Sequence, residues 1–295
     1  MDQLDDLLLE TSRTFALTIP LLPEPTRRAT CLAYLLFRIS DTFEDASTWT
    51  RDDRIAALRT WSDVLRDTGA WQSRARSLSA EWLAKSPSSH EGYLRLIGAI
   101  GEVLAAVEAL TPPRRHIVVE HAIRSADGMA DVLGRSDADG FVRLLDLADL
   151  QSYCYIVAGI VGELLTSLFL HDSPILAGEA KALRAHERAF GEALQLVNIL
   201  KDEHDDASEG RRFLPGGVAR ADIIKLARGD LAEAQAYTDA LERGGAPRGF
   251  IAFTSFPRDL AQKTLDLVEK DGPGAKVSRM VVMEMMLRYR ALAAS

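Results

Sequence analysis

Two acidic clusters in distant parts of the sequence hold the side chains best suited to chemistry. The first is Asp41-Thr42-Phe43-Glu44-Asp45, and the second is Asp202-Glu203-His204-Asp205-Asp206. In each cluster two aspartates stand four residues apart, which in a helix places both carboxylates on one face, one turn apart. Two such faces pointed at each other would offer oxygen ligands to Mg²⁺, which usually shares a few carboxylates with substrate phosphates and water. The pattern predicts a Mg²⁺-diphosphate site inside a helical bundle.

The spacing is informative only in its context, because the 25 aspartates of the chain form five such pairs: 2/6, 41/45, 63/67, 127/131 and 202/206. The pair Asp63/Asp67 lies among arginines and reads as a solvated helix face. The pairs at 41 and 202 differ because each follows a long apolar run. Carboxylates beside a core are costly unless a metal or a basic partner neutralises them.

The composition argues for a folded protein that does not bind nucleic acid. The chain has 295 residues, 47% of them apolar, with a net charge of −8 and a pI near 5.4. No basic run with interleaved aromatics occurs, so nucleic acid is excluded as a partner. Both cysteines, Cys31 and Cys154, stand in apolar helical contexts and are expected to be reduced, buried thiols of a cytoplasmic protein.

No membrane-spanning helix is expected from the sequence. The longest apolar run, Tyr155 to Leu170, is about 16 residues and contains Glu163, whereas a bilayer span needs about 20. The N-terminus carries acidic residues and does not resemble a signal peptide. The interpretation is a cytoplasmic protein that either stays soluble or touches a membrane without crossing it.

The remaining pattern predicts one all-α domain over residues 1–295. Apolar residues recur at three- and four-residue steps, prolines fall where helices would start or stop, and no alternating strand pattern occurs. Pro257 is the exception, since it falls within a helical stretch. Helices are expected near 24–45, 51–68, 76–84, 90–110, 113–134, 137–170, 175–206, 228–243, 247–270 and 276–293.

Three other stretches carry candidate site residues, each with a plainer alternative. Ser12-Arg13-Thr14-Phe15 could hold phosphate oxygens, or could be a helix cap beside an exposed arginine. In the segment 153–163, Gly159 and Gly162 predict the close approach of a ligand chain or simply of another helix. Gln195, Asn198 and Asp202 form a polar stripe on an apolar helix, which lines a cavity or makes a satisfied helix contact.

Taken together, these stretches resemble the squalene and phytoene synthases, the head-to-head prenyl synthases of the all-helical isoprenoid fold. Five segments in order carry the resemblance: Ser12-Arg13-Thr14-Phe15, Arg38-x-x-Asp41-Thr42-x-Glu44-Asp45, Tyr153-Cys154-Tyr155-x-Val157-Ala158-Gly159-x-Val161-Gly162, Gln195-x-x-Asn198-Ile199-x-x-Asp202-x-x-x-Asp206 and Gly210-Arg211-Arg212-Phe213-Leu214-Pro215. The first aspartate-rich segment has the form that squalene synthases favour. The resemblance spans residues 12 to 215 and implies a single-domain helical bundle with a central cavity.

The resemblance implies a site residue by residue. Tyr153 would assist catalysis together with Asp41, Asp45, Asp202 and Asp206. The metal ligands would be Asp41, Glu44, Asp45, Asn198, Asp202, Asp205 and Asp206. The substrate would contact Ser12, Arg13, Thr14, Phe15, Arg38, Val157, Gly159, Gln195, Asn198, Lys201 and Arg212.

The implied reaction joins two prenyl diphosphates, of which farnesyl diphosphate is expected, through a cyclopropyl diphosphate to a C30 product such as squalene. Mg²⁺ is the implied cofactor, and NADPH is needed only for a reduced product. The alternatives within the family are dehydrosqualene, phytoene or presqualene diphosphate. The alternatives outside it are another enzyme of the same fold, such as a terpene cyclase or a chain elongator, and a non-catalytic helical interaction protein. Lys201, Asp205, Phe213 and Ile156 depart from the usual family residues, which puts the product in question more than catalysis. The oligomeric state is left open.

The C-terminal helix is a candidate for membrane contact, because the implied product is almost insoluble in water. Its apolar residues either form an exposed patch that touches the bilayer or close the bundle. They are Val277, Met280, Val281, Val282, Met285, Met286 and Leu287.

Overall fold

The computed structural model describes residues 3–12, 14–136, 142–208 and 211–295. Over these ranges the chain is all α-helical, without a β-strand, and one isolated parallel bridge pairs Arg143 with Arg212. The predicted all-α class is therefore confirmed. The helices form two compact units, one of Met1–Ile19 with Glu24–Arg135 and one of Pro20–Pro23 with Ser136–Ser295. The expectation of one domain over 1–295, and that of a central cavity, stay predictions.

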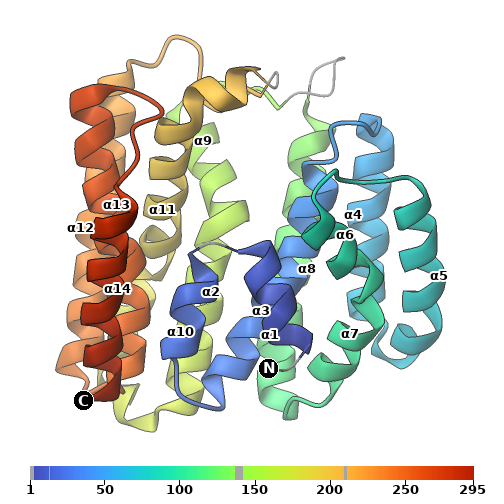
Figure 1. The fold of residues 1–295 in the computed structure, drawn as a ribbon, viewed down its shortest axis with the longest axis horizontal. Helices are drawn as coiled ribbons and strands as arrows, with labels where there is room; N and C mark the ends of the chain where they lie inside the picture. Colours follow the sequence, from blue (N-terminus) through green and yellow to red (C-terminus); the bar gives the residue numbers. More distant parts are fainter. Residues whose placement is uncertain (1–2, 13, 137–141, 209–210) are drawn as a thin grey trace. The chain divides into compact units, whose positions relative to one another are not determined.

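The first unit is a bundle in which α3, α4 and α8 pack side by side (Figure 1). Trp61 and Leu58 of α4 and Leu133 of α8 are fully buried there, and each such side chain contributes roughly 1.5–3 kcal/mol through burial. Local signals set the helix starts: the Thr50 hydroxyl accepts the Asp53 N–H at 3.1 Å, and a proline opens α8. The helices are α1 (Gln3–Thr11), α2 (Phe15–Thr18), α3 (Thr26–Glu44), α4 (Arg51–Arg66), α5 (Trp71–Ala84), α6 (Glu91–Gly98), α7 (Ile100–Glu108) and α8 (Pro112–Gly134).

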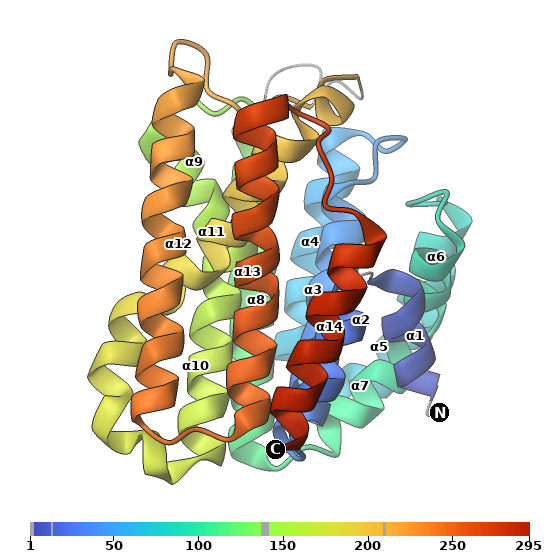
Figure 2. The same cartoon turned by 60° about the vertical axis from the view of Figure 1, so that its left-hand side comes forward.

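The second unit is arranged around α11, which packs against α10, α12 and α13, while α14 lies along α13 (Figure 2). Phe253 and Leu265 of α13 and Leu196 of α11 are almost completely buried in this unit. Pro257 lies inside α13, as expected. The helices are α9 (Leu147–Cys154), α10 (Ile160–Asp172), α11 (Ala180–Ser208), α12 (Arg220–Arg243), α13 (Arg248–Asp271) and α14 (Arg279–Ala294).

Several helix boundaries differ from those expected. The segment predicted as one helix over 90–110 divides at Ala99 into α6 and α7. Of the helix predicted from 137, residues 137–141 lie outside the described residues, and the described helix begins at 147, where Asp146 accepts the Asp149 N–H at 2.9 Å and so caps α9. Helices α1 and α2 were not predicted, because nine and four residues are too short for a clear periodic signal.

The central helix of the second unit is longer than its apolar run suggested. Helix α9 continues through the π-helical turn η3 (Tyr155–Gly159) into α10, so that 26 residues, Leu147–Asp172, form one continuous helix. This helix is long and apolar enough to cross a membrane, which corrects the estimate made from residues 155–170 alone. More than half of its most apolar stretch is buried inside the protein. A buried core helix passes the same test of length and composition, so the test alone assigns no span.

The C-terminal helix α14 divides its apolar residues between two faces. Met285, Met286 and Tyr289 are buried, whereas Met280, Met283 and Leu287 are 78%, 66% and 63% exposed. The prediction that Met285 and Met286 belong to an exposed patch is therefore wrong, because these two side chains help to close the bundle. The prediction that Met280 and Leu287 are exposed is confirmed.

Candidate active site

The first acidic cluster lies at the C-terminal end of α3. Asp41 is in the last turn, Glu44 is its last residue and is buried, and the N–H of Asp45 donates to the carbonyl of Asp41 at 2.9 Å. The C-terminal end of a helix carries a partial negative charge, so carboxylates gathered there are destabilising unless a cation joins them. The hydrogen bond from Asp45 to Asp41 agrees with the helical step predicted between them, and the position of the two residues at the negative end of the helix favours a bound cation.

Arg38 is the positive charge nearest to this cluster. Its Nη1 lies 3.2 Å from Oδ2 of Asp41, and its Nε donates to the hydroxyl of Tyr34 at 3.2 Å. Its guanidinium carbon also lies 5.5 Å from the ring centre of Tyr34 and 5.3 Å from that of Tyr93. Burial opposes the charged form of Arg38, but Asp41 and the two tyrosines outweigh it and raise the pKa of Arg38 above its ordinary value. Arg38 thus stays charged beside Asp41.

Arg38 does not fully compensate Asp41. Burial raises the pKa of Asp41 to about 6, and the neighbouring charge of Asp45 acts in the same direction, whereas Arg38 lowers it. A carboxylate held in this state gains from an additional cation. The oxygen donors suit Mg²⁺, which prefers carboxylates and water. The donor chemistry and the charge of Asp41 and Asp45 suit the predicted metal, although over the described residues they do not form a complete set of metal ligands.

The polar segment before α2 acts in part as a helix cap, the plainer of the two roles predicted for it. The hydroxyl of Ser12 accepts the N–H of Phe15 at 2.9 Å, as a helix cap does, and the ring of Phe15 lies 5.8 Å from that of Tyr34. The hydroxyl of Ser12 can still donate its hydrogen to a phosphate oxygen. Thr14 is half-buried and its carbonyl accepts the N–H of Leu17. Arg13 lies outside the described residues, as does Gly210.

The second acidic cluster occupies the C-terminal end of α11, at the negative end of that helix (Figure 2). Nζ of Lys201 lies 3.0 Å from Oδ2 of Asp202 and donates to Oδ1 of Asn198 at 3.4 Å. Nη2 of Arg211 lies 3.1 Å from Oδ1 of Asp206. The side chains of Asn198, Asp202 and Lys201 therefore lie together, as the four-residue stripe predicts. Of the other predicted residues, Gln195 is half-buried, and Asp205 and Arg212 are exposed.

Tyr153 lies beside the segment that follows this cluster. It is 4% exposed, and its ring stacks on that of Phe213, with ring centres 5.1 Å apart and planes at 18°. The bridge between Arg143 and Arg212 holds the neighbouring backbone. The tyrosine two residues on is placed differently, because the guanidinium of Arg188 lies 4.1 Å from the ring centre of Tyr155. The structure therefore separates two phenols that the sequence shows only as neighbours.

The close approach predicted at the glycines is present, and the partner is α11. A β-carbon at Gly162 would lie 1.8 Å from the carbonyl oxygen of Glu187, and one at Gly159 would lie 2.9 Å from Oε1 of Glu192. Tight helix packing, the plainer alternative, accounts for Gly162. Val157 is half-buried in the π-turn. The roles of Gly159 and Val157 toward a substrate stay predictions.

Sequence reasoning missed an acidic group between α11 and α12. Asp230 of α12 has a buried Oδ2 that no described group hydrogen-bonds. Burial raises the pKa of Asp230 to about 7, helped by the charges of Glu192 and Glu233. Burial likewise raises the pKa of Glu192, although Arg188 opposes it at 3.3 Å. Only the spacing of Arg188 and Glu192 along α11 could have signalled part of this group.

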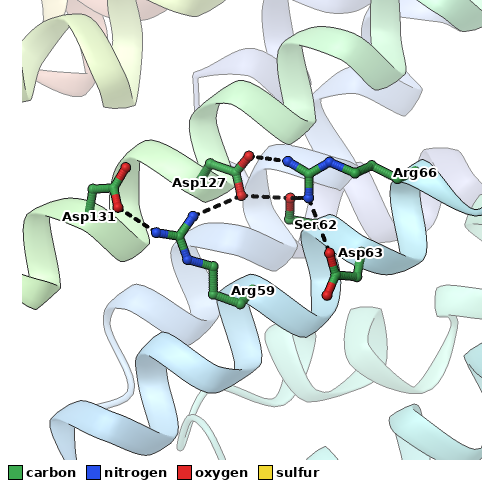
Figure 3. A network of polar contacts seen from close by, with 6 residues as sticks. All are labelled: Arg59, Ser62, Asp63, Arg66, Asp127 and Asp131. Atoms are coloured by element: carbon green, nitrogen blue, oxygen red, sulfur yellow. Dashed lines mark hydrogen bonds and ion pairs between the residues drawn. The ribbon is translucent and has the colours of Figure 1, made fainter.

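The Asp127/Asp131 pair belongs to an ion-pair network that joins α4 to α8 (Figure 3). Arg59 donates to Oδ1 of Asp127 at 3.1 Å and also binds Asp131, while Arg66 binds Oδ2 of Asp127. Ser62 donates to Oδ1 of Asp127 at 2.8 Å, and Arg66 also donates to Oδ1 of Asp63 at 3.2 Å. The prediction of a solvated face at Asp63 is incomplete, because its helix also uses Arg59 and Arg66 to hold α8.

Neither unit, over its described residues, gathers three or more His, Cys, Asp or Glu side chains closely enough to hold a metal ion. Each unit carries one of the predicted aspartate pairs, and Cys31 and Cys154 are buried and not joined by a disulfide bond, as expected. Burial and the charges of Glu192 and Asp230 raise the pKa of Cys154 far above its ordinary range. That thiol is therefore inert.

Comparison with known proteins agrees with the family resemblance that the motifs carry. A "Probable squalene synthase" of Neurospora crassa is 30% identical over 207 residues, which are 70% of this chain and 40% of the relative. The chain thus spans about two fifths of the length of the curated relatives it matches. Two solved structures share the fold: a ligand complex of TcSQS has a TM-score of 0.73 at 23% identity and covers 99% of this chain and 90% of that one. A dehydrosqualene synthase complex has a TM-score of 0.61 at 20% identity and covers 98% and 94%.

The sequence profile of the squalene/phytoene synthases matches residues 8–222, a range that includes both aspartate pairs, Tyr153 and Phe213. With the described geometry of those residues, this match settles the relationship: the chain belongs to the squalene/phytoene synthase family.

Proposed function

We propose that this protein is a Mg²⁺-dependent prenyltransferase that joins two allylic prenyl diphosphates head to head. The observation that carries the proposal is the pair of helix ends, on α3 and α11, that each present Asp-x-x-x-Asp where the helix already carries negative charge. Such ends are destabilising in a purely structural role, and a diphosphate with its metal ions relieves the repulsion. The retention of all four aspartates counts against a non-catalytic relative.

The residues have distinct roles in the proposed reaction. Asp41, Asp45, Asp202 and Asp206 would hold Mg²⁺, with Glu44, Asn198 and Asp205 as further ligands, and the metal would neutralise the diphosphate as it leaves. Ser12, Arg13, Arg38, Lys201 and Arg212 would bind diphosphate oxygens through charge-assisted bonds. Thr14, Phe15, Val157, Gly159 and Gln195 would contact the substrate beside them.

The carbon–carbon bond forms when the double bond of the second substrate attacks the allylic cation left by the first. Loss of one proton closes a cyclopropane and gives a cyclopropyl diphosphate, and in this proposal Tyr153 assists that loss. Its ring is buried under Phe213, which keeps water from the phenol and so from a nearby cation. Ionisation of this intermediate and hydride transfer from NADPH would give squalene, whereas proton loss would give dehydrosqualene.

The direct test is mass analysis of the products formed from farnesyl diphosphate and Mg²⁺, with and without NADPH. A C30 hydrocarbon or its cyclopropyl diphosphate precursor supports the proposal, and the effect of NADPH identifies the reduced product. Geranylgeranyl diphosphate serves as the matched longer substrate, for which phytoene is the corresponding product. Recovery of only unreacted diphosphates or farnesol from the folded protein would contradict it.

Tyr153 is tested by comparison with its neighbour. Tyr153→Phe should slow cyclopropane formation in a single turnover about 10²-fold while diphosphate affinity changes little. Tyr155→Phe is the matched control, since that ring stacks on Arg188. Equal rates for both variants would return Tyr153 to an ordinary packing role.

We further propose that the protein works in the cytoplasm and touches the membrane surface through α14. The exposed side chains of Met280, Met283 and Leu287 stand at i, i+3 and i+7 and so share one face. The exposed basic residues Lys276, Arg279 and Arg290 suit anionic lipid headgroups. Flotation with phosphatidylserine vesicles should fall at least fivefold in a variant with Met280, Met283 and Leu287 changed to serine. Equal flotation of the two proteins would contradict docking through this face.

A further inference from the structure

The helix that carries Tyr153 contains one residue more than a regular α-helix would place there. Its π-helical turn, Tyr155–Gly159, interrupts the continuous helix between α9 and α10. A π-turn of this kind accommodates a single extra residue and often marks a functional site. The turn lies two residues beyond Tyr153.

Two backbone contacts fix this turn against α11. A β-carbon at Gly162 would lie 1.8 Å from the carbonyl oxygen of Glu187, and a β-carbon at Gly191 would lie 2.0 Å from that of Ala158. The contacts stand four residues apart on both helices, Ala158 to Gly162 and Glu187 to Gly191, as expected for two antiparallel helices in register. The second contact is made by a carbonyl of the π-turn itself.

If the series of contacts continues by one more turn, it determines which residue faces the polar stripe. Four residues beyond Gly191 on α11 stands Gln195, the first residue of the stripe that leads to Asp202. On the facing helix, a regular step of four from Ala158 would bring Cys154 to this position, whereas a π-turn step of five would bring Tyr153. Because each residue of an α-helix turns by about 100°, the extra residue changes the direction of the phenol by that amount.

We infer that the π-turn absorbs one surplus residue and thereby turns Tyr153 toward α11, and that Gly191 is a positioning residue that holds the turn in place. The inference rests on the proposed function, since it concerns the placement of Tyr153 for the condensation. Adding a methyl group at Gly191 must separate the π-turn from α11 by about 1 Å or more. A displacement of that size at a reacting group costs on the order of 10²-fold in rate.

The test uses the full chain with four variants: Gly191→Ala, deletion of Ile156, both changes together, and Gly229→Ala. Gly229 on α12 is the matched control because a β-carbon there meets nothing within 4 Å. We expect Gly191→Ala to lower kcat for condensation about 100-fold with KM changed less than threefold. Gly229→Ala should leave both values unchanged.

Deletion of Ile156 should convert the π-turn into a regular turn and leave the flanking faces in place. The melting temperature should then stay within about 5 °C of the parent, whereas deletion of Ser167, in regular α10, should rotate the following residues by about 100° and prevent folding. Once the π-turn is gone, we expect the carbonyl of Ala158 to move away from Gly191. In the deletion background Gly191→Ala should therefore lower kcat less than threefold.

Three outcomes would overturn the inference: full kcat in Gly191→Ala, an unfolded protein after deletion of Ile156, or no rescue in the combined variant. If Gly191→Ala alone does not fold, the combined variant decides, because regained folding supports the inference and continued failure contradicts it. Absence of any condensation product from the parent chain would contradict the proposed function instead. The melting temperatures of the deletion variants would still test the π-turn in that case.

Discussion

Two aspartate pairs in the first unit share the same spacing and meet opposite surroundings. Asp127 and Asp131 on α8 receive two arginines and a serine from α4, so their charge is matched by hydrogen-bond donors (Figure 3). Asp41 on α3 has Arg38 at 3.2 Å, and its pKa is nevertheless raised to about 6. The Asp127/Asp131 pair therefore joins two helices, whereas Asp41 is only partly compensated by nearby positive charge. The partners supplied by neighbouring helices, rather than the spacing, distinguish a structural clamp from a site.

The largest expected effect is on turnover. Asp41→Ala and Asp202→Ala should each lower the rate of product formation at least about 10³-fold, because each removes a carboxylate from the proposed diphosphate site. Asp127→Ala should retain turnover within a few-fold at a temperature where it is folded. Product formation at near the parent rate by Asp41→Ala would remove the distinction between the pairs.

Ligand-induced stabilisation is the second way to separate the two pairs. Mg²⁺ with inorganic diphosphate at about 100 times its Kd should stabilise the parent by about 2.7 kcal/mol, or roughly 5–10 °C in melting temperature. Asp127→Ala should show the same shift, and Asp41→Ala should show none. Without ligand, Asp41→Ala should melt within a few degrees of the parent, since the loss of a poorly compensated carboxylate is offset by the loss of the partner of Arg38. An equal shift in all three proteins would contradict a site at Asp41.

The clamp itself is tested by stability. Asp127→Ala should lower the free energy of unfolding by about 1–2 kcal/mol, because Arg59, Ser62 and Arg66 lose an acceptor. Asp131→Ala should cost no more than about 0.5 kcal/mol, since its side chain is 70% exposed. Denaturant titration measures both values. Equal losses at the two positions would show that the network does not act through Asp127.

Asp230 has a buried carboxylate oxygen with no described hydrogen-bond partner, and its raised pKa predicts a smaller effect on stability that depends on pH. Its pKa in the folded protein is raised to about 7, so the folded state holds a proton that the unfolded state releases near pH 4. The contribution of Asp230 to the free energy of unfolding is therefore fully present below about pH 4 and is lost as the pH rises to about 7. The melting temperature of Asp230→Asn, relative to the parent, should rise across this interval and then level off. A difference in melting temperature that does not change with pH would show that Asp230 is not the group with the raised pKa.

Some of these features follow from the local sequence. The helical class, the apolar runs that end at Asp41 and Asp202, and the alignment of Asn198 with Asp202 depend on the helical period, which residue order fixes directly. The starts of α4 and α8 follow equally from Thr50 and from a proline, since a cap acts within one turn. These elements were predicted to within a few residues.

Other features depend on which helices become neighbours, and no local pattern contains that information. The arginines that neutralise Asp127 come from α4, and the ring that covers Tyr153 comes from the segment after α11. Met285 and Met280 are chemically alike, and only tertiary packing buries the first and leaves the second exposed. The π-turn at Tyr155–Gly159 likewise forms where α11 contacts the helix, because the fit between two backbones, rather than helix propensity, decides where one surplus residue is held.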